Sequence, residues 1–141
     1  MRRMYHARLP LTATNDHARA AELREMSSAL DANLRVLQRV KNDLLRQRKA
    51  DAKQGREGMT AEQVVRSALV KQMFSFSYDE LAFHLGDSQV LRGFCRLLPA
   101  MTSPKRSTLQ ANIGAVRPET WEAINKAIVL FARERKIEDG R

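Results

Sequence analysis

Two cations beside a polar helix start are the first group of residues whose types and spacing could do chemistry. Lys105 and Arg106 follow Pro104 and precede Ser107, where a short amphipathic segment begins. Free backbone amides at a helix N-terminus attract anions, and the two side chains add formal positive charge there. Groups of this kind hold phosphates in nucleic-acid complexes. The sequence therefore predicts a contact with a phosphate backbone at this point.

Polar side chains that can read base edges follow in the same segment. Leu109 and Ile113 are four residues apart and should share the inward face of a helix. The polar side chains expected on its outer side are then Ser107, Thr108, Gln110 and Asn112. Glutamine and asparagine can pair with adenine through two hydrogen bonds, and arginine with guanine. Arg92 and Arg96, on one face of the preceding segment, are further candidates for base or backbone contact.

Other chemistries lack the residues that they need. The histidines lie in three separate segments without the spacing of zinc ligands: His6, His17 and His84. Two-metal catalysis needs carboxylates that converge from different elements. Glu80 and Asp87 are instead explained as a capping partner and as a helix start. Cys95 is the only cysteine, lies among apolar residues and is expected in the core, so no internal disulfide forms. We predict no catalytic residue, no metal and no cofactor in this chain.

The candidate residues are carried by short helices with clear start signals. We expect three of them, starting at Ser77, at Asp87 or Ser88, and at Ser107, and ending near Gly86, before Pro99 and near Gly114. Ser77 with Glu80, and Ser107 with Gln110, have the spacing of a capping box. Short helices joined by tight turns are typical of a helix-turn-helix module. Arg92 stands where that motif usually has an apolar residue, which favours the third helix over the second as the recognition helix.

Helices are also predicted on both sides of this region, which gives an all-α fold. Thr60 and Gln63 form a further capping box before an apolar helical face. Pro118 is suited to the first turn of a last helix, in which Trp121 is expected to anchor the core. No stretch shows the alternation with period two that a half-buried strand would need.

The first half of the chain has a repeat of apolar residues at helical spacing. Steps of three and four residues separate Leu23, Met26, Leu30, Leu37, Val40 and Leu44, with Asn33 and Gln47 at the polar positions of the repeat. We expect one long helix over residues 16–56, after a flexible basic arm over residues 1–15. Residues 23–47 either pair with a second copy as a coiled coil or pack on the helices downstream. Leu34 and Leu45 widen the apolar stripe, which argues for packing within the chain.

Composition indicates a polyanionic partner. The 141 residues include 25 Lys and Arg against 16 Asp and Glu, for a net charge of +9 and a pI near 10.4. Double-stranded DNA is the simplest partner for such a charge. No apolar run approaches the ~20 residues that cross a bilayer, and there is no secretory signal, so we expect a cytoplasmic protein.

Three phrases resemble a known family. SYDELAFHLGDSQVLRGFCRL, STLQANI and RPETWEAIN, in this order and spacing, resemble the N-terminal region of bacterial insertion-sequence transposases of the DDE type, in particular the InsH-like group. The resemblance covers about residues 58–141. It implies a DNA-binding region ahead of an RNase H-like catalytic core, and assembly as a dimer or larger complex. The first catalytic aspartate of that family follows in an Asp-Ser-Thr phrase, which this chain does not contain.

The sequence thus predicts the DNA-binding and assembly region of an insertion-sequence transposase, without its catalytic core. A DNA-binding domain over residues 58–137 would hold the terminal inverted repeats of the element, and residues 23–47 would favour self-association. Two alternatives stay open. One is a free-standing helix-turn-helix regulator, and the other is a helical scaffold protein whose basic charge is incidental.

Overall fold

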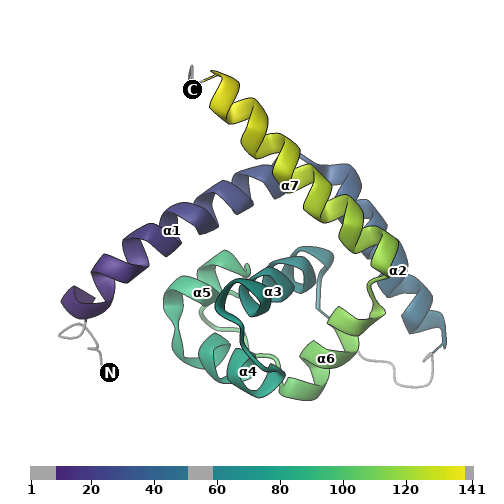
Figure 1. Ribbon diagram of the computed structural model, residues 1–141. Helices are drawn as coiled ribbons and strands as arrows, with labels where there is room; N and C mark the ends of the chain where they lie inside the picture. The colour runs from purple at the N-terminus through teal and green to yellow at the C-terminus, as the bar shows by residue number, and fades with distance from the viewer. Residues whose placement is uncertain (1–8, 51–58, 139–141) are drawn as a thin grey trace.

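Seven α-helices build the part of the chain that the computed structural model describes, residues 9–50 and 59–138. They are α1 (Leu9–Asp31), α2 (Leu34–Ala50), α3 (Ala61–Phe74), α4 (Tyr78–Asp87), α5 (Gln89–Phe94), α6 (Arg106–Ala115) and α7 (Pro118–Glu138). No strand occurs in these residues, so the prediction of an all-α fold is confirmed. In Figure 1, α3 to α6 form one cluster, and α1, α2 and α7 lie along its upper and right-hand sides.

The first helix begins earlier than its sequence suggested. α1 starts at Leu9, within the residues that we had assigned to the basic arm. Pro10 lies in the first turn of this helix, where a missing backbone N–H is tolerated. Arg2, Arg3 and Arg8 of the predicted arm lie outside the described residues.

The long helix predicted over residues 16–56 is wrong, because it is two helices. The chain leaves the α-helix at Ala32 and Asn33 and resumes it in α2. The Asn33 side-chain amide donates to the Ala29 carbonyl at 2.7 Å, and the Asn33 carbonyl accepts from the Val36 N–H at 3.1 Å. Asparagine competes in this way for backbone groups and ends helices. The last part of the predicted helix, residues 51–56, lies outside the described part of the chain.

The break turns the apolar repeat inward on both sides of Asn33. Leu23 and Leu30 of α1 and Leu37, Val40 and Leu44 of α2 are all buried in the common core. Leu30 keeps 2% of its surface exposed and Val40 none. Packing within the chain, the second of our two alternatives, therefore accounts for this repeat, and self-association through residues 23–47 stays a prediction.

The central helix α3 has the predicted start. Thr60 accepts from the Gln63 N–H at 3.2 Å, and the Gln63 side chain accepts from the Thr60 N–H at 3.1 Å. The helix ends at Ser75, whose φ of 56° is left-handed. Val64, Val65 and Val70 of α3 are fully buried, and α2, α4 and α6 pack against this helix.

The capping box of α4 is confirmed, but the ends of α4 and α5 differ from those predicted. Ser77 accepts from the Glu80 N–H at 3.1 Å, and Glu80 accepts from the Ser77 N–H at 2.8 Å. Gly86 lies inside α4 rather than after it, because the Ser88 N–H continues the helical pattern by bonding to the His84 carbonyl.

Ser88, one of the two predicted starts, caps α5 by accepting from the Leu91 N–H. α5 does not extend toward Pro99 but ends at Phe94, and Arg96 takes a left-handed φ of 62°.

α6 starts two residues earlier than predicted. The Leu109 N–H already bonds to the Lys105 carbonyl at 3.0 Å, so Lys105 is the N-cap residue and Ser107 lies within the first turn. The predicted Ser107–Gln110 capping box is wrong, because no side chain caps this helix. Its first amide groups are left open.

A carboxylate from α2 fixes the start of α7. Pro118 occupies its first turn, as predicted. Asp43 accepts from the Arg117 N–H at 3.0 Å and from the Thr120 hydroxyl at 2.6 Å. Trp121, the predicted anchor, is partly buried against the core. None of the helices in the described residues is long and apolar enough to pass through a membrane.

Candidate nucleic-acid interface

α6 is held in place by two apolar side chains that point inward as predicted. Leu109 is fully buried and Ile113 is buried, and both belong to the core cluster. The helix packs against α3 and α4, which hold its opposite face toward solvent. α4 and α6 are separated by α5 and by residues 95–105, so no tight turn joins them. The helix-turn-helix assignment stays a prediction.

The N-terminal end of α6 is cationic and exposed. Lys105 lies in solvent and has no ion pair with a described residue. Arg106 contacts Asp79 of α4, with 3.2 Å between its Nε and the Asp79 Oδ1, and both side chains are more than half exposed. Exposed ion pairs contribute little to stability. Asp79 can therefore be exchanged for another anion at low cost.

The other predicted residues of α6 divide between two flanks of the helix. Ser107 and Gln110 are exposed. Gln110 is three residues from Ser107 and four from Arg106, so it lies on the same side of the helix as both. Thr108 and Asn112 form the opposite flank and are partly buried. The Asn112 amide donates to the Thr108 carbonyl at 2.8 Å. Gln110 and Asn112 therefore lie on different flanks of α6, because residues two apart on a helix do not share a face, and their part in DNA binding stays a prediction.

Arg92 is used inside the fold. Its guanidinium donates to the Leu85, Leu98 and Met101 carbonyls at 3.0, 2.9 and 2.8 Å, and to the Ser103 hydroxyl at 2.6 Å. These bonds fasten the segment after α5 to the end of α4. These four acceptors explain why an arginine occupies position 92, where an apolar residue was expected. Because the guanidinium is engaged by them, α5 loses its main candidate for a base contact.

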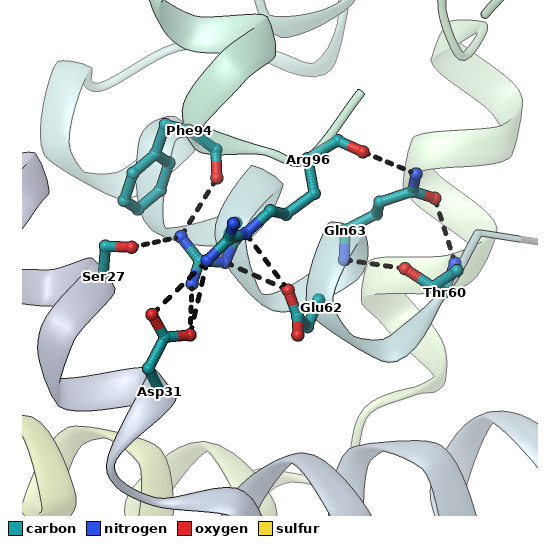
Figure 2. A network of polar contacts seen from close by, with 8 residues as sticks. Ser27, Asp31, Thr60, Glu62, Gln63, Phe94 and Arg96 are labelled. Carbon is teal, nitrogen blue, oxygen red and sulfur yellow. Dashed lines mark hydrogen bonds and ion pairs between the residues drawn. The ribbon is translucent and has the colours of Figure 1, made fainter. Parts of the chain in front are cut away.

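Arg96 does not share a helix face with Arg92, because it lies beyond the end of α5 in a left-handed conformation. Its Nε is 3.3 Å from Glu62, and its Nη2 is 3.3 Å from Asp31 (Figure 2). Asp31 and Glu62 are spread over α1 and α3, so no spacing in the sequence joins them to Arg96.

A buried arginine shares the same two carboxylates. Arg66 of α3 has 1% of its side chain exposed and lies 3.2 Å from Asp31 and 3.8 Å from Glu62. It also donates to the Ser27 hydroxyl at 2.9 Å and to the Phe94 carbonyl at 3.1 Å. Burial, and then the positive charge of Arg96, lower the pKa of Arg66. The network ties α1, α3 and the end of α5 together, and it has a structural role.

The acidic and histidine side chains of the described residues are not grouped as metal ligands. No group of three histidine, cysteine, aspartate or glutamate side chains that could hold a metal ion occurs in the part of the chain that is described. The two hydrogen bonds from Ser77 lower the pKa of Glu80, as its capping role requires. His84 stacks on Phe76 with ring centroids 4.4 Å apart.

Residues 11–114 match the protein family described as Transposase domain (DUF772). The matched range runs from the first turns of α1 to the last turn of α6 and is more than half of the 141 residues. The chain belongs to this transposase-domain family. No curated protein and no solved structure matches it.

The match includes both the exposed side of α6 and the arginine network, so both are parts of the transposase domain. α7 follows the matched range. The DDE type and the InsH-like group are narrower assignments than the family, and they stay predictions. Sequence reasoning missed Asp79, Asp43 and Arg66. Only Arg66 had a signal, as a lone cation in the apolar stretch of α3.

Proposed function

We propose that this transposase domain binds double-stranded DNA at the ends of a mobile element, with α6 as the recognition helix. The observation that carries the proposal is the exposed side of α6, where Lys105, Arg106 and Gln110 lie over an inward face fixed by Leu109 and Ile113. Membership of a transposase-domain family and a net charge of +9 support the same partner.

The proposed contacts divide between positioning and reading. Lys105, Arg106 and the open amides at the start of α6 hold phosphates, with a phosphate replacing Asp79 beside Arg106. Ser107 and Gln110, next along the same side, reach base edges. Thr108 and Asn112 face the other flank and contribute less. In this proposal the chain holds the terminal inverted repeats, and a separate RNase H-like core carries out strand cleavage and joining.

The proposal predicts a specific preference that depends on Gln110. Binding of the full chain is measured by fluorescence anisotropy, on a candidate element end and on random duplex, over a salt series. The wild-type chain should prefer the element end, and Gln110→Ala should weaken that preference by about 1–3 kcal/mol while binding to random duplex changes little. Gln72→Ala, at an exposed glutamine near the end of α3, is the matched control and should leave the preference unchanged.

Two results would contradict the proposal. Equal binding of both duplexes, falling steeply with salt, would mean phosphate contact without base reading. No binding to either duplex would favour the scaffold alternative.

A further inference from the structure

The exposed surface of α2 carries a row of arginines that has no role in the site on α6. Arg35, Arg39 and Arg46 are separated by four and seven residues, so they lie along one side of the helix, with Asn42 beside them. All four side chains are exposed. The row extends over 11 residues, or about 16 Å of helix at 1.5 Å per residue. We call Arg35, Arg39 and Arg46 the α2 arginine row.

The charge of this row is not balanced by neighbouring carboxylates. Asp43 is the one acidic residue in the sequence of α2, and it is 7% exposed and turned toward the start of α7. None of the acidic side chains among the described residues forms an ion pair with Arg35, Arg39 or Arg46.

Four arginines of the fold differ in this respect. Arg66, Arg96, Arg106 and Arg117 each have a carboxylate partner.

The row is also rigid, because the opposite face of α2 is anchored. Val36, Val40 and Leu44 are buried in the core. Like charges four residues apart, as at Arg35 and Arg39, disfavour a helix, so the row lowers the stability of the free protein slightly. A polyanion that approaches the row removes this repulsion. Guanidinium groups also match phosphate oxygens in a geometry with two hydrogen bonds.

We propose that the α2 arginine row is a second DNA-binding surface, which holds backbone phosphates of a duplex without reading its sequence. This inference rests on the proposed function, because it extends DNA binding from α6 to a further helix. The row suits DNA better than a lipid surface, since a helix that lies in a membrane must present an apolar face, and the apolar face of α2 is buried in the core.

The test compares two variants of the full chain that lose the same charge. The first is Arg35→Gln, Arg39→Gln and Arg46→Gln together. The control removes three exposed cations from α1 and α7 that also lack ion pairs with described residues, by Arg24→Gln, Lys126→Gln and Arg133→Gln. Affinity for random duplex DNA is measured from low to moderate salt. Each phosphate contact contributes about 0.9 to the slope of log affinity against log salt.

The row variant should lower that slope by about 2.7 units, since three contacts are lost, and the control by less than 1. At low salt, the affinity of the row variant for random duplex DNA should fall at least ten times more than the affinity of the control variant. Equal losses in the two variants would overturn the proposal, because net charge alone would explain them. An unchanged slope in the row variant would overturn it as well.

Two further measurements keep the result interpretable. The unfolding temperature of the row variant should be unchanged or higher than that of the wild type, because like charges have been removed. If this temperature is lower, the single substitution Arg39→Gln is used instead of the triple variant, and the slope should then change by about 0.9. Tighter binding of the wild-type row to duplex RNA or to anionic vesicles than to duplex DNA would overturn the proposal. If the row variant behaves like its control while Gln110→Ala still weakens the preference for the element end, the second surface is refuted and the proposed function is not. If the wild-type chain does not bind DNA at all, both proposals are refuted.

Discussion

Neighbours decide what each arginine of this protein does. Arg92 and Arg96 have the same charge and a spacing that suggested one DNA-binding face. In the fold, Arg92 binds three carbonyl groups and a hydroxyl, and Arg96 binds the carboxylates of Asp31 and Glu62. Arg106 differs because it has a single ion pair among the described residues, with the Asp79 carboxylate, which is 79% exposed. It is the arginine of the predicted set that remains open to exchange with a phosphate.

Cys95 is the residue whose chemistry depends most on burial. Its side chain is fully buried beside α3, and burial raises the pKa of the thiol to about 12, against opposing effects of Ser67 and Arg66. The unfolded thiol ionises near its ordinary pKa of 9, so the folded form loses stability as the pH rises from 9 toward 12, and below 9 the thiol has no effect.

We expect Cys95 to resist labelling in the native protein. At pH 8 a disulfide reagent should modify the thiol at once in 6 M guanidinium chloride, but in native buffer only at the rate at which the chain opens, because the thiolate is the reactive form. The reaction is followed by absorbance of the released thiolate. Fast labelling without denaturant would show that Cys95 is accessible.

At the scale of elements, local and tertiary capping have different consequences. The starts of α3 and α4 are set by capping boxes within four residues, and both were predicted correctly. The start of α7 depends on Asp43, which is 74 residues away from Arg117 in the sequence. α6 has no side-chain cap, which leaves its amides open to a phosphate.

Removal of the Asp43 carboxylate should loosen α7 from α2. Asp43→Ala leaves the Arg117 N–H and the Thr120 hydroxyl without their acceptor, and hydrogen bonds to a charged group contribute about 1.5–3 kcal/mol each. We expect a loss of about 2–4 kcal/mol in the free energy of unfolding, measured by urea denaturation. Asn42→Ala, at the exposed neighbouring position, should change it by less than about 0.5 kcal/mol. Similar effects of the two substitutions would argue against a tertiary cap.

At the scale of the whole molecule, the apolar repeat of the first half is used for the core of one chain. Leu30→Ala should therefore lower the free energy of unfolding by about 2–5 kcal/mol, because it leaves a cavity in a packed interior. Leu34→Ala, at a side chain that is 68% exposed, should change it by less than about 0.5 kcal/mol.

The same experiment tests the coiled-coil alternative. The unfolding midpoint of the wild type should not depend on protein concentration, since the repeat is buried within one chain. A midpoint that rises with concentration would show that stability depends on a second copy.

The sequence by itself determined the helical class, two capping boxes, the burial of Cys95 and the inward face of α6. Each of these depends on residues within one or two turns of a helix, where spacing fixes geometry. The tertiary structure decided the rest. It bonded Arg92 to groups at the end of α4 and in the segment after α5, paired Arg96 with Asp31 and Glu62, and placed Asp79 beside Arg106. These outcomes depend on partners in other helices or connecting segments, and a side chain finds such partners only after the helices have packed.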